Sequence, residues 1–224
     1  MRGEGARQLA LDLPHAESFR RDDFLESPAN AAALALIERW PDWPSPNAAI
    51  IGPAGAGKSH LAAIWAERAG ARIVAAKALS PAGVPGALAT GALVIEDLAA
   101  GEVEEPALFH LLNLAREQRA FLLLTSRERL DRGAFGLADL ASRLRAISVV
   151  TLAPPDDALI AAVLVKLFAD RQLKIDADVV SFLVPRIERS LAAVEAIVAR
   201  LDAAALSRGR AVTRVLASEV LRQE

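Results

Sequence analysis

A phosphate-loop pattern constrains this chain more than any other stretch of its sequence. Residues 52–59 read GPAGAGKS and fit the pattern G-x-x-x-x-G-K-[ST]. The loop follows the apolar run NAAII at 47–51 and opens the helical stretch HLAAIWAERAG at 60–70. A strand, a glycine-rich turn and a helix in this order turn backbone N–H groups and the positive end of the helix toward a phosphate. The pattern therefore predicts an α/β fold that binds a nucleotide.

The members of the loop have distinct expected tasks. The glycines allow the backbone to curl around a phosphate. The ammonium of Lys58 is expected to reach the β- and γ-phosphate oxygens, and the hydroxyl of Ser59 is expected to hold Mg²⁺. We therefore assign nucleotide binding to Gly52, Pro53, Ala54, Gly55, Ala56, Gly57, Lys58 and Ser59.

Short apolar runs alternate with helical stretches as far as Leu152. The helical stretches cover 28–40, 60–70 and 106–118. The apolar runs read as buried strands at 47–51, 71–76, 92–96, 120–125 and 147–152. Strands that are apolar throughout and alternate with helices are typical of a parallel sheet covered on both faces. The expected fold class is therefore α/β, with a five-stranded parallel sheet around the phosphate loop.

The pattern changes at LAPPDD, residues 152–157. Two prolines end the last strand, and either Asp156 or Asp157 can cap a new helix. The remainder is expected to be helical, over 157–170, 176–186, 190–207 and 213–223. We therefore divide the chain into a tail at 1–17, an α/β base domain at 18–153 and a small helical lid domain at 154–224.

Polar side chains end two of the expected strands. Glu96 and Asp97 close the third apolar run, and Thr125 closes the fourth. An acid beside a phosphate loop positions hydrated Mg²⁺ or an attacking water, so these three residues are candidate catalytic residues, and Ser59 and Asp97 are the expected Mg²⁺ ligands. The alternatives that stay open are a solvated strand end for the acids and a helix cap for Thr125.

Composition excludes several functional classes. The chain is 53% hydrophobic and 24% charged with a net charge of −2, which is typical of an ordinary globular protein and not of a general nucleic-acid binder. It has no cysteine, which excludes disulfides, thiolate catalysis and cysteine-bound zinc. The longest apolar run, 158–165, is too short to span a membrane, and the N-terminus lacks the apolar region of a secretory signal. We expect a cytoplasmic protein without a membrane segment.

Together these motifs resemble the AAA+ ATPases of the DnaA type, and within that group the short Hda-type regulators. The resemblance covers nearly the whole chain through the order and spacing of FRRDDFLESPAN (19–30), IIGPAGAGKSHL (50–61), LVIEDL (93–98), LLLTSRERL (122–130), LADLASRLRAISVVTLAPPDD (137–157) and RGRAVTRVLASEVL (208–221). It implies an AAA+ base and a helical lid with ADP or ATP and Mg²⁺ between them, and it adds His60 to the nucleotide site.

The resemblance also implies that Arg143 is an arginine finger, supplied in trans to the ATP of another subunit, with Arg145 as the alternative. Two departures from the family pattern stand out. Glu96 replaces the usual aspartate, and Ala192 falls where the lid helix carries a nucleotide-sensing arginine, with Arg189 one helical turn earlier. We therefore expect a nucleotide-binding protein with little or no ATPase activity of its own.

The hexad QLALDL at residues 8–13 has two interpretations. Its leucines alternate, as they would in an edge strand. It also resembles the clamp-binding peptide of Hda-type proteins, in which the glutamine makes polar contacts and the leucines enter an apolar groove. The sheet already has five expected strands, so we favour clamp binding through Gln8, Leu9, Leu11 and Leu13.

The implied function is regulation of replication initiation. The resemblance predicts a protein that binds the β sliding clamp of DNA polymerase III and stimulates hydrolysis of DnaA-bound ATP. Because the chain ends near the end of the lid, we expect no sequence-specific DNA binding, and self-association is left open. The alternatives are an autonomous AAA+ ATPase, such as a helicase loader or a transposition helper, and, with less support, a small-molecule kinase.

Overall fold

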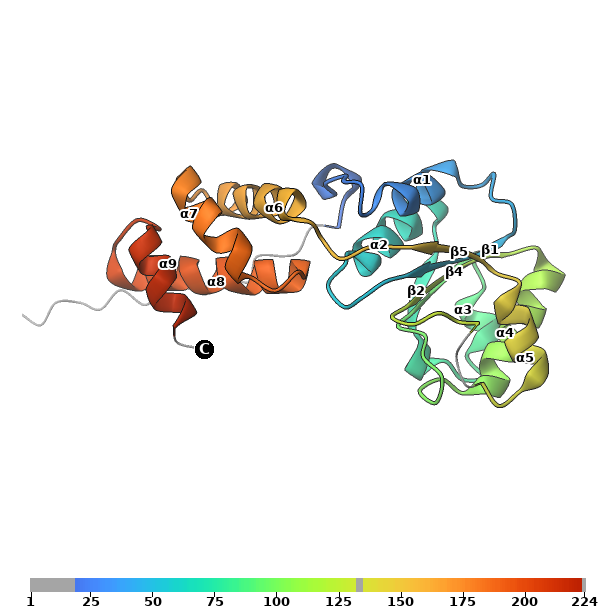
Figure 1. Cartoon of the computed structure of the whole chain (residues 1–224). Coiled ribbons are helices and arrows are strands. Elements are labelled where there is room, and N and C mark those ends of the chain that lie inside the picture. Colours follow the sequence, from blue (N-terminus) through green and yellow to red (C-terminus); the bar gives the residue numbers. More distant parts are fainter. Residues whose placement is uncertain (1–18, 132–134, 223–224) are drawn as a thin grey trace, which may run out of the picture.

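The computed structural model describes residues 19–131 and 135–222, which form two bodies joined by an extended segment (Figure 1). The larger body, the base, holds a five-stranded sheet, and the smaller body, the lid, is built from helices α6 to α9. The lid lies beyond the edge at which the strands end. The proposed clamp-binding hexad lies outside the described residues, and the domain boundaries given above remain predictions.

The sheet has the strand order β2-β3-β4-β1-β5, and every neighbouring pair is parallel. Its strands are β1 Asn47–Ile51, β2 Arg72–Ala75, β3 Ala92–Glu96, β4 Phe121–Ser126 and β5 Ser148–Thr151. The three central strands are almost wholly buried, because helices cover both of their faces. The predicted α/β fold with a five-stranded parallel sheet is confirmed.

Two groups of helices cover the sheet, one on each face. The first group is α1 (Ala31–Arg39) and α2 (Lys58–Ala69), which pack on side chains such as Ile50 and Leu123. The second group is α3 (Val84–Ala87), α4 (Glu105–Gln118) and α5 (Ala138–Arg145), which share a core with Leu122 and Leu124. Since Leu122, Leu123 and Leu124 are consecutive, their alternation between the two cores follows the period of the strand. The result is a three-layer base.

The lid has an apolar core of its own around the fully buried Phe168. Its helices are α6 Asp157–Asp170, α7 Ala177–Leu183, α8 Leu191–Arg208 and α9 Arg214–Leu221. Asp156 is the cap of the first of these, since its Oδ1 accepts a hydrogen bond from the N–H of Leu159 at 2.7 Å. Three short 3₁₀ turns, η1 Arg21–Asp23, η2 Ala76–Ala78 and η3 Val184–Arg186, complete the described elements.

Helix α5 is the main element that the sequence interpretation left out. It is short, and its buried side chains Leu140 and Leu144 stand one turn apart among exposed polar residues. That i, i+4 pair is the signal that could have identified it. The omission matters because α5 carries Arg143.

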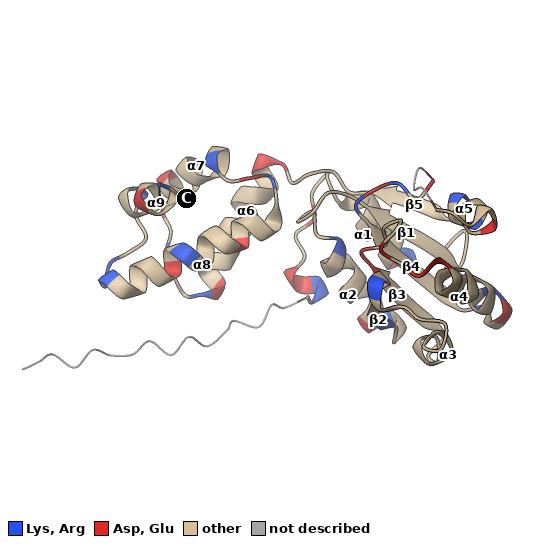
Figure 2. Ribbon diagram, turned by 90° about the horizontal axis from the view of Figure 1, so that it is seen from below, with Lys and Arg blue, Asp and Glu red and all other residues tan. Residues whose placement is uncertain are grey.

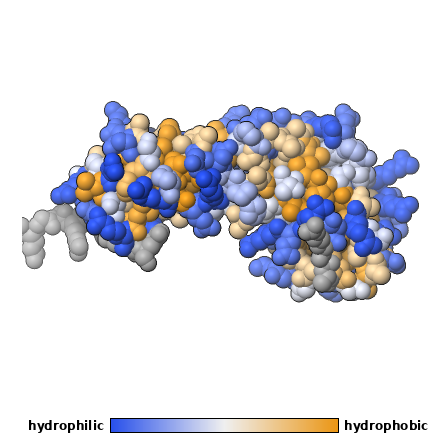
Figure 3. All heavy atoms as spheres, in the orientation of Figure 1, coloured by the Kyte–Doolittle hydropathy of each residue, from blue (hydrophilic) through white to orange (hydrophobic). Residues whose placement is uncertain are grey.

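The surface shows no single dominant charge. Figure 2 shows acidic and basic residues spread over both the base and the lid. Figure 3 shows exposed apolar atoms on the face of the base that carries the edge strand β5, where Val149 is exposed. No helix in the described ranges is both long and apolar enough to cross a membrane.

Candidate functional site

The phosphate loop adopts the conformation that its glycines permit. Gly55 has φ +66° and Gly57 has φ +95°, which lie in the left-handed region that glycine enters without steric cost. Lys58 begins α2 directly after this turn. Its Nζ donates hydrogen bonds to the carbonyl oxygens of Gly52 and Pro53, both at 2.8 Å. The loop and the start of α2 therefore form one closed unit around the lysine, and the contact of Lys58 with phosphate stays a prediction.

Lys58 is the buried cation of the site, with only 6% of its surface exposed. Burial lowers the pKa of its ammonium below the ordinary value for lysine, and the nearby Asp97 and Glu96 carboxylates offset part of that effect. A phosphate group would supply the full counter-charge that the two carboxylates give only in part.

The tips of β3 and β4 are tied together by hydroxyl groups. The N–H of Asp97 donates to Oγ1 of Thr125 at 3.0 Å, and Asp97 has a left-handed φ of +52° with its carboxylate exposed. Thr125 itself is only 1% exposed. Of the candidate catalytic residues, Asp97 therefore faces solvent beside Lys58, whereas Thr125 lies beneath it and positions it.

Ser126, the second hydroxyl residue at this strand end, belongs to the same site, although only Thr125 was named as a candidate catalytic residue. Its Oγ donates to the carbonyl oxygen of Leu98 at 2.7 Å, and its own carbonyl oxygen accepts from the N–H of Gly52 at 3.1 Å. It therefore connects the loop after β3 to the phosphate loop. Two hydroxyl residues in a row at a strand end were the available signal.

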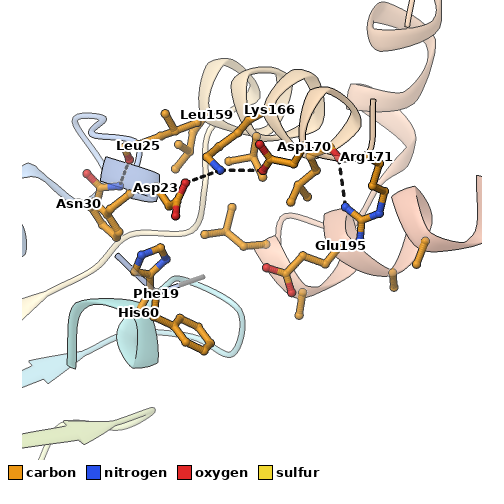
Figure 4. A pocket seen from close by; sticks show the side chains of 17 residues that line it. Phe19, Asp23, Leu25, Asn30, His60, Leu159, Lys166, Asp170, Arg171 and Glu195 are labelled. Carbon is orange, nitrogen blue, oxygen red and sulfur yellow. Dashed lines mark hydrogen bonds and ion pairs between the residues drawn. The ribbon is translucent and has the colours of Figure 1, made fainter. Parts of the chain in front are cut away.

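A cleft of about 670 Å³ lies beside the phosphate loop, between the base and the lid (Figure 4). His60 forms part of its wall, and its ring contacts Phe19 and Phe24 edge-on at centroid distances of 5.4 and 5.2 Å. Its Nε2 lies 3.0 Å from the carbonyl oxygen of Arg20. These contacts attach the segment before α1 to the start of α2, so that aromatic and apolar groups line the base side.

The lid side of the cleft carries an ion pair to the base. Nζ of Lys166 lies 2.8 Å from Oδ1 of Asp23 and 2.7 Å from Oδ2 of Asp170 (Figure 4). Desolvation opposes the charge on Lys166, but its two hydrogen-bonded carboxylates outweigh this and raise its pKa. Lys166 thus stays charged and links α6 to the segment η1.

Arg189, the possible substitute for the nucleotide-sensing arginine of the lid, does not line this cleft. Ala192 and Glu195 do line it. Arg189 is 58% exposed, and it forms an ion pair with Asp157 at 2.9 Å and a hydrogen bond to the carbonyl oxygen of Pro155. Arg189 is therefore bound to the segment between base and lid.

The lid also contacts the phosphate loop directly. The N–H of Leu191, the first residue of α8, donates to the carbonyl oxygen of Gly55 at 2.7 Å. Ser190 lies so close that a Cβ on Gly55 would stand 1.9 Å from its Oγ. Glycine at this position is therefore required twice, by the left-handed φ and by the approach of the lid.

Arg143 lies at the end of the sheet where the strands begin, whereas the phosphate loop lies at the end where they finish. Arg143 lines a cavity of about 570 Å³ with Asn47 and Phe121, which begin β1 and β4, whereas the phosphate loop follows the end of β1. Its guanidinium lies over the ring of Phe109, 5.0 Å from the centroid. Arg127, in contrast, lines a pocket at the strand ends with Asp97.

Comparisons with known proteins agree with this architecture. The family model for the lid domain of Hda matches residues 157–221. Domain III of the replication initiation protein DnaA from Thermotoga maritima has a TM-score of 0.73 at 18% identity, over 92% of this chain and 96% of that chain. AMPPCP-bound DnaA from Aquifex aeolicus has a TM-score of 0.65 at 17% identity, over 81% of this chain and 64% of that chain. The RuvB branch migration motor from Thermotoga maritima has a TM-score of 0.73 at 15% identity, over 92% and 72%. No curated protein sequence matches the chain.

At these identities the structural likeness shows the fold alone, whereas the family match is specific to the lid. The base and lid together have the AAA+ fold of DnaA domain III. Helices α6 to α9 fall within the segment that matches the Hda lid. The resemblance read from the sequence motifs is confirmed at this level: residues 157–221 match the lid domain of Hda, and the base and lid together share the fold of DnaA domain III.

Proposed function

We propose that this chain is a regulator of replication initiation, which binds an adenine nucleotide and stimulates the hydrolysis of ATP bound to DnaA. The observation that carries the proposal is the combination of a lid of the Hda family with a base of the DnaA fold. The position of Arg143, away from the chain's own phosphate loop, supports an action on a second protein.

Nucleotide binding is supported by the phosphate loop and the adjoining cleft. The DnaA of Aquifex aeolicus binds AMPPCP with the same fold, and this chain has the buried Lys58 that a polyphosphate needs as partner. The hydroxyl of Ser59 and the carboxylate of Asp97 both belong to exposed residues near that lysine, so they fit Mg²⁺ as ligands. When bound, the ion neutralises phosphate charge.

The site favours holding a nucleotide over hydrolysing it. Glu96 replaces the aspartate of the family pattern, and Ala192 supplies no cation at the lid position. Arg189 is engaged with Asp157 and Pro155 and does not line the cleft. We therefore propose that ADP or ATP serves as a structural and regulatory ligand, and that the chain has little or no ATPase activity alone.

Arg143 is the residue proposed to act in trans. An arginine finger stabilises charge on a transferring phosphoryl group and accelerates hydrolysis by about 10³–10⁵-fold in well-studied GTPases. Such a residue must reach the nucleotide of another subunit. A position at the edge where the strands begin suits that requirement, because it leaves the chain's own nucleotide site free.

The test measures hydrolysis of DnaA-bound ATP in the presence of clamp loaded on DNA. Arg143→Ala is expected to lower the maximal rate by at least about 100-fold. Arg145→Ala, two residues along the same helix, is the matched control and is expected to keep most of the rate. Full activity of the Arg143→Ala protein would remove the finger assignment.

Clamp binding is tested separately with the intact chain and the variants Gln8→Ala and Leu11→Ala in a pull-down with the β clamp. Both variants are expected to lose retention. If the unmodified chain fails to bind the clamp, the clamp part of the proposal is wrong. Rapid ATP turnover by the isolated chain would favour the autonomous ATPase.

A further inference from the structure

We infer that the cavity beside Arg143 is a docking groove for an acidic segment of a partner protein, one in which a large apolar side chain is flanked by carboxylates. The groove has a volume of about 570 Å³, within the range of about 300–1,000 Å³ that is common for ligand clefts. It is formed by the loop before β1, the C-terminal end of α4 and the junction between α5 and β5. We call it the arginine groove.

The charged side chains that line the arginine groove are all positive. Its charged lining residues are Arg116, Arg119 and Arg143, and no Asp or Glu lines it among the residues that the structure describes. None of these arginines forms an ion pair with another described residue. Clusters of arginines without counter-charges are a recurring means of recognising acidic peptide motifs.

Arg119 gives the strongest indication that one of these side chains is there to bind. It caps the C-terminus of α4 with φ +55°, a conformation in which glycine is the usual residue. An arginine there carries a backbone strain that glycine would avoid. This conformation places Arg119 among the residues that line the groove.

Part of the groove wall is formed by packed aromatic side chains. Trp43 is stacked on Trp65 at a centroid distance of 5.2 Å, and its Nε1 donates to the carbonyl oxygen of Leu36 at 2.7 Å. Phe121 meets Trp43 edge-on at 6.0 Å. Aromatic side chains and arginine are the residues most enriched where protein partners are bound. A large apolar side chain of the partner could pack against this aromatic wall.

A peptide suits the arginine groove better than a polyphosphate does. Helices α4 and α5 both direct their C-terminal ends, which carry partial negative charge, toward it. No glycine loop or helix N-terminus lines it to supply converging N–H groups. Asn47, at its wall, has a buried side-chain oxygen with no hydrogen-bond donor among the described residues.

The inference rests on the proposed function only for the partner's identity. A segment seated in the groove would lie against Arg143 and so hold the partner where that residue acts. Arg116 and Arg119 are then positioning residues: their loss should raise the concentration of this chain needed for half-maximal stimulation of DnaA ATP hydrolysis, with the maximal rate kept. Loss of Arg143 should lower the maximal rate itself.

The direct test pans a library of random short peptides on the immobilised full chain. Retained peptides are expected to be rich in Asp and Glu around Phe, Leu or Trp, and to bind about tenfold more weakly to the double variant Arg116→Ala, Arg119→Gly. Arg210→Ala, at an exposed arginine of the lid, is the matched control and should bind as the unmodified chain does. Binding should weaken as salt rises.

Three results would overturn the inference: no acidic enrichment, peptides that bind the double variant equally well, or complete displacement of the peptides by inorganic tripolyphosphate bound at Arg119. Because Arg119→Gly relieves a strained backbone, the variant should melt no lower than the unmodified chain, so a failure to fold would not imitate a loss of binding. If the peptides still bind but Arg143→Ala leaves DnaA ATP hydrolysis unchanged, the docking groove is supported and the assignment of Arg143 as an arginine finger is wrong.

Discussion

Nζ of Lys166 lies 2.8 Å from Oδ1 of Asp23, and this ion pair joins α6 of the lid to the segment before α1 of the base. Both side chains are about a quarter exposed, so solvent screens the pair only in part. The pair stands at the wall of the cleft. If a nucleotide is held there, separation of base and lid should speed its release, so we expect the pair to slow that release.

Lys166→Ala should therefore release ADP about two to five times faster, which corresponds to the roughly 0.5–1 kcal/mol of a partly exposed pair. Stopped-flow release of a fluorescent ADP analogue measures this. Asp170→Asn is the control, because it removes the partner within α6 and leaves Asp23 in place. Equal release rates for Lys166→Ala and the unmodified chain would contradict a linking role.

Lys58 predicts an alkaline limit to nucleotide binding. Burial lowers its pKa, so the free protein loses this charge at a lower pH than an ordinary lysine, whose value is about 10.4. A bound phosphate raises the pKa again, so binding takes up a proton in the interval between the two values. ADP affinity should fall as pH rises through that interval, while the stability of the free protein rises there because the unfolded chain holds more protons.

Titration calorimetry in two buffers of different ionisation enthalpy measures that proton uptake. Lys58→Met should show weak binding without the pH-dependent fall. If the ADP affinity of Lys58→Met falls equally with rising pH, the titrating group is not Lys58.

Thr125→Val should disturb the position of Asp97. The substitution keeps the buried shape but removes the acceptor for the Asp97 N–H, and an unpaired buried or half-buried donor costs about 1–3 kcal/mol. We expect a lower melting temperature and a weaker effect of Mg²⁺ on ADP affinity. Thr125→Ser, which keeps the oxygen, should retain the Mg²⁺ effect. If valine retains it as well, the hydroxyl does not position Asp97.

Gly55→Ala should separate the lid from the phosphate loop. The new Cβ would stand 1.9 Å from Oγ of Ser190, in addition to about 1–2 kcal/mol of strain from the left-handed φ. Gly70→Ala is the matched control, since Gly70 has nearly the same φ, +63°, but open space around it. Limited proteolysis of the segment between base and lid should be faster in Gly55→Ala alone. Equal cleavage of the two variants would mean that the contact with Ser190 does not hold the lid.

Much of the fold was predictable because the sheet is parallel and covered on both faces. Runs such as ALVIE then carry strong apolar signals, and GPAGAGKS fixes the order of strand, loop and helix. Helix α5 was not found, because its burial depends on only Leu140 and Leu144. Its position, which brings Arg143 beside residues from α4 and β1, follows from tertiary packing that local pattern does not contain.

The sequence identified the residues of the candidate site, but it did not show what each of them does in the fold. Thr125 and Asp97 were both candidates, yet only the register of β3 and β4 shows that one lies beneath the other. The sequence likewise left either Asp156 or Asp157 as the cap, and the folded chain uses Asp156, whereas Asp157 is the first residue of α6 and pairs with Arg189. Such choices are decided by neighbours distant in sequence.

The placement of Lys58 and Arg143 at opposite edges of the sheet has a consequence for how these molecules could assemble. Two different faces that complement each other give a head-to-tail contact, never a two-fold one. Each added copy then leaves one face of each kind unfilled. A head-to-tail assembly of this kind stops growing when it closes into a ring. It also stops when a related protein that has only one of the two faces binds at its end.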